Sequence, residues 1–425
     1  MNIRFYNARI LTMEDNKDIF EGELWTCESR IFYVGTKEDA PEKIPFDREI
    51  DCNKNLIMPG FKNAHTHSAM TFLRSHADDL PLGDWLNNQV FPFEAKLSAE
   101  DIKELTKLAI LEYLTSGITS IMEMYLTPES IADACEELGM RIVQTGGMNN
   151  FSQSIELQEE WYAKLNNRTS LSSYVPGFHA EYTCSEELLK EMSKFVNKLQ
   201  APCFAHICET KSEVEGCVER HGMTPFVYLD SLGLFNYGGG GYHCVHISDE
   251  DLEVIKKRKL FVITNPGSNT KLASGIAPIE QYLKEGVDLA IGTDGPASNN
   301  CLDMFREMFL VTGLAKLKSE DASAVDAKEV LKMATVGGAK AMGLRDCDVL
   351  SRGKLADLIM IDLNKPNMRP IHNIEKNLVY SGSKANVKLT MIDGKILYED
   401  GKFNLPVSET KIYDICEEIT KKICY

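Results

Sequence analysis

The sequence predicts an α/β protein built on a (β/α)8 TIM-like barrel, with a small β-sandwich formed by both ends of the chain. Three observations lead to this prediction. Short apolar runs alternate with longer amphipathic stretches through the middle of the chain, eight such runs are present, and no GxGxxG turn favours an open, doubly wound sheet. Strands that alternate with helices pair in parallel, and eight such units close a barrel.

The eight predicted barrel strands are short apolar segments separated by helical patterns. The first ends at His65, in LIMPGFKNAH. The other seven are 117–124, 140–147, 173–181, 202–209, 240–247, 260–266 and 287–295. The two clearest helical patterns, 99–117 and 184–200, each open near a serine that can cap the first turn.

The two ends of the chain have a different character from the middle. Short β-like pieces such as NIRFYNARILT occur before residue 58, and similar pieces such as VKLTMIDGKILYED occur after residue 351. We therefore expect residues 1–57 and 352–425 to form one composite β-sandwich, and residues 58–351 to form the barrel domain that carries the active site.

Composition and cysteine usage are those expected of a soluble, cytosolic protein. Of 425 residues, 44% are hydrophobic and 26% are charged, and the formal net charge of -17 argues against nucleic-acid or anionic-membrane partners. The 12 cysteines form no CxxC pair, as expected of reduced thiols. Neither a secretion signal nor an apolar run of the roughly 20 residues that span a membrane is visible.

Side chains with useful chemistry collect at the predicted strand ends, where a barrel places its active site. His65 and His67 lie two residues apart, so a strand would present both imidazoles on the same face. Six of the nine histidines and two acidic residues follow the predicted strands: His65, His67, His179, His206, His243, His246, Glu209 and Asp294. Several histidines from different strands of one barrel indicate a metal site rather than separate packing roles.

One divalent metal ion per chain is the predicted cofactor. His65, His67, His206 and Asp294 would supply three nitrogens and one carboxylate oxygen, a set that suits zinc, with Fe(II) as the alternative. Such a metal lowers the pKa of water from about 15.7 to about 7, so that hydroxide is available at neutral pH. The pattern therefore predicts a hydrolytic metal centre.

Four motifs together resemble the amidohydrolase superfamily: NAHTHSAM, AHICET, GYHCVHI and GTDGPASNN. More narrowly, the chain resembles the branch of S-adenosylhomocysteine/5'-methylthioadenosine deaminases and related adenosine-type deaminases. The likeness covers nearly the whole chain, including NPGSNTKLASGIAPI and GKLADLIMIDL. It implies a mononuclear aminohydrolase that uses water to replace the amino group of an adenosine-type nucleoside, releasing ammonia and the inosine analogue.

The resemblance also implies a role for each site residue. Those that match the family's metal ligands are His65, His67, His206 and Asp294. Glu209 matches the acid that protonates a ring nitrogen of the purine, and His243 matches the histidine that polarises the attacking water. Asp294 accepts a proton from that water and passes it to the leaving amine. Glu94 matches a residue that grips ribose hydroxyls, and His179 matches one that contacts the base.

This sequence departs from the family pattern after the third strand. Members that take S-adenosylhomocysteine carry arginines there, whereas here no arginine lies between Arg141 and Arg168. A substrate carboxylate without a guanidinium partner lacks a charge-assisted, often bidentate hydrogen bond. We therefore expect adenosine, 5'-deoxyadenosine or 5'-methylthioadenosine to be better substrates. Gly146 aligns with one absent arginine. We therefore expect Gly146→Arg to narrow the difference in kcat/KM between these substrates and S-adenosylhomocysteine.

Other interpretations remain open at this stage. The fourth strand has no lysine that could be carboxylated to bridge two metals, which favours a single metal. A guanine, other purine or triazine-type aminohydrolase would share the metal ligands, and a catalytically silent metal-binding protein is the alternative from another class. Beyond the nucleoside and water, the sequence leaves a homo-oligomer open. We expect a structural role for His246, because a strand would turn it away from His243.

Overall fold

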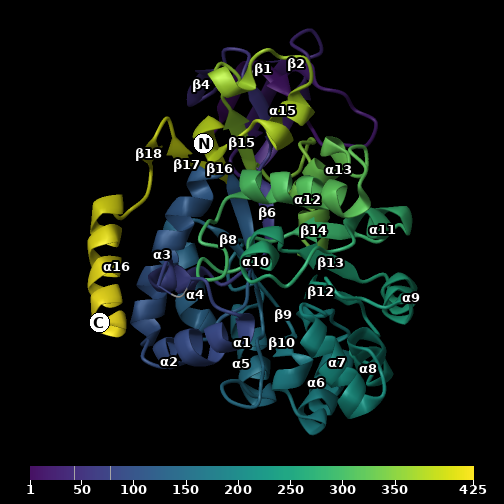
Figure 1. Ribbon diagram of the computed structural model, residues 1–425. Helices are drawn as coiled ribbons and strands as arrows, with labels where there is room; N and C mark the ends of the chain where they lie inside the picture. The colour runs from purple at the N-terminus through teal and green to yellow at the C-terminus, as the bar shows by residue number, and fades with distance from the viewer. Residues whose placement is uncertain (43, 77) are drawn as a thin grey trace.

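The computed structural model describes residues 1–42, 44–76 and 78–425, in which a barrel of strands and helices carries a second sheet at one end (Figure 1). The strand β5 (Leu56–Pro59) belongs to this second sheet and leads directly into the first barrel strand, β6 (Phe61–Thr66). The second sheet therefore lies at the amino ends of the barrel strands. Their carboxyl ends, where the predicted site residues follow, point away from it.

The barrel strands form two parallel sheets, β6 to β9 and β10 to β14. After β6 they are β7 (Ile118–Glu123), β8 (Arg141–Thr145), β9 (Ser172–Val175), β10 (Gly177–Ala180), β11 (Cys203–Ile207), β12 (Gly239–His243), β13 (Phe261–Thr264) and β14 (Leu289–Ile291). Pro176, which has no N–H to donate, separates β9 from β10, so the two are halves of the fourth barrel strand. The predicted (β/α)8 barrel is confirmed.

Helices surround the barrel strands in Figure 1. They are α3 (Ala99–Thr115), α4 (Pro128–Leu138), α5 (Ile155–Leu165), α6 (Glu186–Leu199), α7 (Lys211–His221), α8 (Pro225–Ser231), α9 (Asp249–Arg258), α10 (Pro266–Lys271), α11 (Ile279–Lys284), α12 (Met304–Ser319), α13 (Ala327–Lys332) and α14 (Gly338–Ala341). Both predicted serine caps are present. Ser98 accepts the N–H of Asp101 at 3.1 Å, and Ser185 accepts that of Leu188 at 3.2 Å.

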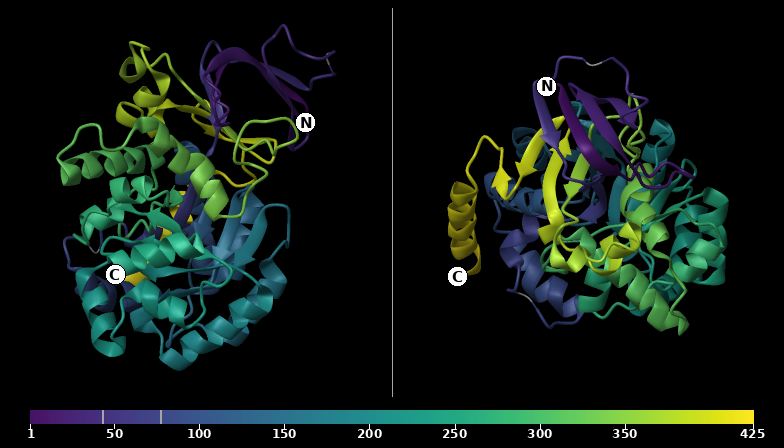
Figure 2. Two further views of the ribbon diagram at one scale, coloured as in Figure 1. Left: turned by 90° about the vertical axis from the view of Figure 1, so that its right-hand side faces the viewer. Right: turned by 90° about the horizontal axis from the view of Figure 1, so that it is seen from above.

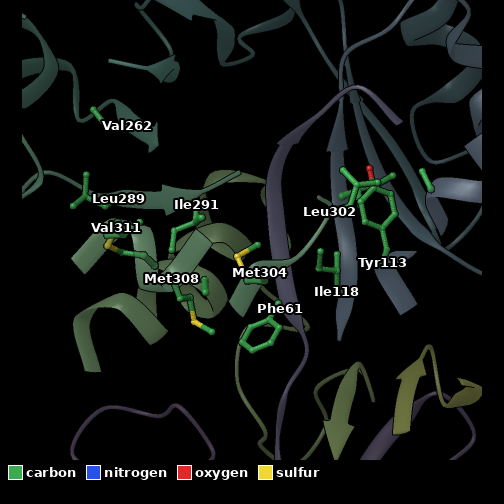
Figure 3. Packing of buried hydrophobic residues seen from close by; sticks show 14 of the residues in the cluster. Phe61, Tyr113, Ile118, Val262, Leu289, Ile291, Leu302, Met304, Met308 and Val311 are labelled. Atoms are coloured by element: carbon green, nitrogen blue, oxygen red, sulfur yellow. The ribbon is translucent and has the colours of Figure 1, made fainter. Parts of the chain in front are cut away.

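A buried apolar layer joins the strands to the outer helices. Figure 3 shows Ile291 of β14 close to Met308 of α12, with Phe61 of β6 nearby. The Phe61 ring packs edge-on against Phe305 of α12, with 5.2 Å between the ring centroids. Burying each such side chain contributes about 1.5–3 kcal/mol, so this layer holds the strand ends, and hence the site, in fixed positions.

Both ends of the chain build the second sheet, which fits the predicted small β-sandwich. The right-hand view in Figure 2 shows the purple amino-terminal strands beside the yellow carboxyl-terminal ones. Besides β5, the strands are β1 (Ile3–Ile10), β2 (Phe20–Cys27), β3 (Arg30–Gly35), β4 (Arg48–Asp51), β15 (Leu358–Ile361), β16 (Val387–Ile392), β17 (Lys395–Glu399) and β18 (Lys402–Phe403). The two halves meet where β5 pairs antiparallel with β15.

The last helix, α16 (Glu409–Cys424), lies beside α3 of the barrel in Figure 1. Its buried side chains, Ile412, Cys416, Ile419 and Ile423, recur at helical spacing and form one apolar stripe. The Cys416 thiol contacts the carbonyl oxygen of Glu104 on α3 at 3.4 Å. Helix α16 thus contacts the barrel, although its residues belong to the range 352–425 that was predicted to form the β-sandwich. The division of the chain into domains stays a prediction. Among the described helices, none combines the length and apolar character that a membrane span requires.

A buried ion pair connects the barrel to the second sheet. Arg141, at the start of β8, donates from Nε to Asp357 Oδ2 at 2.6 Å and from Nη2 to Oδ1 at 3.0 Å. The two side chains are 3% and 0% exposed. Removing one partner of such a pair leaves the other charge buried and uncompensated.

We expect Asp357→Asn to lower the free energy of unfolding by about 3–5 kcal/mol, because Arg141 keeps its buried charge with only the more distant Asp393, 3.6 Å from Nη2, as a counter-charge. The shift of the urea unfolding midpoint measures the loss. Arg168→Met is the matched control, since Arg168 pairs with Asp133 at the surface, where a pair contributes at most about 1 kcal/mol. Equal small shifts in the two variants would contradict the prediction.

Candidate active site

Four of the predicted side chains lie together at the carboxyl end of the barrel. The Nε2 atoms of His65 and His206 are 3.2 Å apart. Asp294 Oδ1 lies 3.2 Å from His67 Nε2 and 3.6 Å from His65 Nε2. Thr66, between the two histidines, turns away and contacts the Tyr113 hydroxyl, as the alternation along a strand requires. The ends of β6, β11 and β14 thus bring these four side chains together.

Backbone carbonyl groups orient two of the imidazoles. His67 Nδ1 lies 2.5 Å from the carbonyl oxygen of Met124, and His206 Nδ1 lies 2.7 Å from that of His179. A carbonyl oxygen only accepts, so each Nδ1 carries a hydrogen, which leaves each Nε2 as the atom that can bind a metal at the shared centre. This is the tautomer that a metal-binding histidine needs, and the residues present fit a divalent metal ion.

Burial sets the charge state of the cluster. Burial lowers the pKa of His65 and of His206 well below the usual value, so both imidazoles stay neutral. Burial opposes the charge of Asp294, but the hydrogen bond and charge of His67 hold the pKa of Asp294 well below its usual value. Burial likewise lowers the pKa of His67, but Asp294 outweighs it and raises that pKa to about 9. A cation entering the site would displace this shared proton.

The ligating atoms fall into two overlapping groups, each within 4.8 Å. One group is His65, His67 and Asp294, and the other is His65, His206 and His243. His243 donates its Nδ1–H to Asn269 Oδ1 at 2.8 Å. Its Nε2 lies 3.7 Å from Glu209 Oε2, so His243 stands between the metal-binding cluster and the predicted acid.

Glu209 follows β11 and is almost fully buried. Burial raises the pKa of its carboxyl group above the usual value, which favours the protonated form that can donate a proton. The Ser274 hydroxyl donates to Glu209 Oε1 at 3.1 Å. Glu213 accepts the backbone N–H groups of Cys208 and Glu209 at 2.7 and 2.8 Å, and thereby fixes this turn. The spacing of Thr210 and Glu213, which is that of a capping box, is the feature of the sequence that could have predicted this role of Glu213.

Two of the predicted substrate residues, Glu94 and His179, lie near different histidines of the cluster. Glu94, on the short helix α2 (Phe91–Glu94), is 8% exposed, and its Oε1 has no hydrogen-bond partner among the described residues. Burial raises the pKa of Glu94 to about 7, against the effect of the nearby Tyr125 hydroxyl. His179, on β10, has its ring 4.9 Å from that of His206, and burial lowers its pKa to about 4. Both side chains can therefore offer hydrogen-bonding atoms to a ligand.

His246 lies outside the cluster, as expected, but the strand argument for this was wrong. Strand β12 ends at His243, so His246 lies in the loop that follows. There its Nε2 donates to the carbonyl oxygen of Ser274 at 2.6 Å.

Comparison with known proteins gives the same family as the motifs. The sequence model described as Amidohydrolase family matches residues 56–397. The chain belongs to the amidohydrolase family. It is 39% identical to a 5-methylthioadenosine/S-adenosylhomocysteine deaminase of Thermoanaerobacter pseudethanolicus over 98% of each chain. It is also 37% identical to a 5'-deoxyadenosine deaminase of Methanopyrus kandleri over 93% of each chain.

A solved structure is similar over the full length of this amidohydrolase. An adenosine deaminase from Xanthomonas campestris with bound zinc superimposes with a TM-score of 0.92 at 30% sequence identity. The match covers 100% of this chain and 98% of that one. The barrel and the second sheet therefore belong to one fold that both proteins share.

We expect the isolated protein to carry about one divalent metal per chain, and His206→Ala to lose most of it, because one of the converging nitrogens disappears. Elemental analysis after dialysis measures the metal. His246→Ala is the matched control and should keep its metal, since that imidazole binds a backbone carbonyl outside the cluster. Full metal content in His206→Ala would show that His206 is not a ligand.

Proposed function

We propose that this amidohydrolase is a hydrolase of cyclic amidine C–N bonds that deaminates adenosine-type nucleosides, releasing ammonia and the inosine analogue. The observation that carries the proposal is Glu209, a buried acid 3.7 Å from His243 Nε2 and beside the metal-binding cluster, where burial raises its pKa and so favours the proton-donating form. Deamination of a purine needs such a proton for the ring nitrogen. The names of the relatives from Thermoanaerobacter pseudethanolicus and Methanopyrus kandleri support the same substrate class.

The proposed cofactor is one zinc ion held by His65, His67, His206 and Asp294. Three imidazole nitrogens and a carboxylate oxygen suit zinc, with Fe(II) as the alternative, and the Xanthomonas campestris enzyme has bound zinc. When bound, the ion acts as a Lewis acid that makes hydroxide available at neutral pH.

Three side chains then move or direct protons. Asp294, held ionised, accepts a proton from the attacking water and later delivers it to the leaving amine. Glu209, protonated, donates to the ring nitrogen next to the carbon under attack, so that negative charge does not build up there. His243, whose Nδ1–H is fixed by Asn269, uses Nε2 to orient the attacking oxygen. General acid–base groups of this kind each contribute roughly 10²–10⁴ in rate.

The nucleoside is held from two sides in this proposal. Glu94 has a buried oxygen without a hydrogen-bond partner among the described residues, so ribose hydroxyl groups can donate to it. His179 lies beside His206, where it can contact the purine base. A polar atom buried in this way gains most from a ligand that completes its hydrogen bonds.

The surroundings of the nucleoside 5' end favour a neutral group. Two arginines flank the segment in which S-adenosylhomocysteine-binding relatives carry arginines, and both form ion pairs within the protein. Arg141 pairs with Asp357 at the opposite end of the barrel, and Arg168 pairs with Asp133 and Glu136. The structure also adds a cost to Gly146→Arg, whose effect on substrate preference stays a prediction. A Cβ at position 146 would lie 2.2 Å from Oε1 of the buried Gln158, so an arginine there would displace that side chain.

We expect Glu209→Gln to keep its metal while turnover of an adenosine-type substrate falls at least about a hundredfold, because the amide preserves shape but has no acidic proton. Steady-state ammonia release measures turnover, and elemental analysis of the same sample provides the control. Near-normal turnover would remove Glu209 from the mechanism.

We expect adenosine, 5'-deoxyadenosine or 5'-methylthioadenosine to exceed S-adenosylhomocysteine in kcat/KM by roughly ten- to a hundredfold. A homocysteine carboxylate that gives up water without a cationic partner loses about 1–3 kcal/mol. Ammonia release on one metal-loaded preparation provides all four values, with guanine and a triazine as controls. S-adenosylhomocysteine as the best substrate would contradict this account of the pocket, and activity confined to guanine or the triazine would favour the alternative aminohydrolases.

A further inference from the structure

Glu123, the last residue of β7, is a buried carboxylate to which the proposed reaction assigns no role. Its side chain is enclosed, with 1% of the residue exposed. Its two oxygens accept the backbone N–H of Ser68 at 3.0 and 3.1 Å, and the Ser68 hydroxyl also donates to it. Ser68 directly follows His67, so Glu123 holds the chain next to one of the proposed ligands.

A chain of hydroxyl groups extends from this contact to a second ligand. The Ser68 hydroxyl lies 2.9 Å from that of Tyr113, which lies 2.7 Å from the hydroxyl of Thr66. Thr66 donates to the carbonyl oxygen of Asp294 at 3.1 Å. Tyr113 comes from α3 and sits among buried apolar side chains (Figure 3), so these hydroxyl contacts have a fixed anchor. Because Ser68 donates to Glu123 and Thr66 donates to Asp294, the single hydrogen of the Tyr113 hydroxyl serves one of its two contacts at a time.

These contacts constrain the backbone conformation at Asp294 and the orientation of the His67 ring. Asp294 has a φ of 60°, in the left-handed region that a residue with a side chain rarely adopts, and such a conformation persists only where its surroundings fix it. The Thr66 hydroxyl bond to its carbonyl oxygen is one of these constraints. The residue after Glu123, Met124, accepts the Nδ1–H of His67. The end of β7 therefore holds His67 on both sides.

We propose that Glu123 is a positioning residue for the metal centre, which holds His67 directly and Asp294 through Ser68, Tyr113 and Thr66. The inference rests on the metal ligands of the proposed function. It assigns Glu123 no contact with substrate and no part in the movement of protons.

The direction of the hydrogen bonds distinguishes a carboxylate from an amide at this position. Burial raises the pKa of Glu123 to about 7, and in its ionised form the carboxylate accepts from two donors on Ser68, the N–H and the hydroxyl. A glutamine at this position would present an NH2 group to one of these donors. The hydroxyl of Ser68 would then have to reverse its bond, and the pattern that reaches Tyr113 would change with it. Glu123→Gln therefore keeps the volume of the side chain while it disturbs the network.

The test is the rate at which zinc leaves the full-length, zinc-loaded protein for a chromogenic chelator, a readout that needs no substrate. We expect Glu123→Gln to release zinc roughly ten- to a hundredfold faster than the unmodified protein, as is usual when a group that orients metal ligands is lost. Ser68→Ala, which keeps every backbone group, should change the rate in the same direction. If Glu123→Gln does not fold, the zinc-release rate of Ser68→Ala tests the inference on its own.

Asp251→Asn is the matched control. Asp251 is a buried carboxylate that also accepts two backbone N–H groups, those of Phe226 and Ser248, and the hydroxyl of Ser248. It should release zinc at the unmodified rate. An unchanged rate in folded Glu123→Gln and Ser68→Ala, or an equal acceleration in Asp251→Asn, would overturn the inference. If the unmodified protein binds no zinc, the proposed function is overturned as well. That result differs from an unchanged release rate in the variants, which would overturn only the role of Glu123.

Discussion

The backbone hydrogen bond from the N–H of Asp294 to the carbonyl oxygen of His65, 3.0 Å long, joins the last barrel strand to the first. Because parallel strands all present their carboxyl ends on the same side, this closure places an acidic side chain from one end of the barrel sequence against histidines from the other. The carboxylate of Asp294 then lies 3.2 Å from His67 Nε2, with His206 completing the group from β11. The metal centre depends on this closure of the barrel.

Burial determines what the assembled groups can do. Removal from water favours neutral imidazoles and protonated carboxyl groups, and both effects occur here at the same time. His65 and His206 remain neutral and available as ligands, and burial shifts Glu209 toward its protonated form. Asp294 is the exception, because its contact with His67 compensates for the lost hydration. One buried site thus combines an ionised base with an acid that burial shifts toward its protonated form, the combination that hydrolytic deamination requires.

The features that could be predicted from the sequence are those with local periodicity. Alternation along a strand predicted that His65 and His67 share a face, and the structure agrees. The count of apolar runs predicted eight strands, although Pro176 divides the fourth into two segments. The serine caps were likewise visible because capping depends on residues three apart.

The features that could not be predicted depend on contacts between distant segments. Glu123 is an ordinary acidic residue at a strand end until the barrel brings it against Ser68. Asn269 shows its connection to His243 only once β12 and α10 are neighbours. For a related reason the sequence did not show the cost of Gly146→Arg, because alignment places a residue in a sequence but does not show that Gln158 fills the adjacent space.

The central claim is that one metal ion is held by His65, His67, His206 and Asp294, with His243 left free to orient water. Anomalous scattering from crystals of the zinc-loaded protein, recorded at the zinc absorption edge, tests this most directly. The account predicts one peak about 2.0–2.2 Å from the Nε2 atoms of the three histidines and from a carboxylate oxygen of Asp294. A peak bounded instead by His65, His206 and His243, or no peak at the carboxyl end of the barrel, would contradict it.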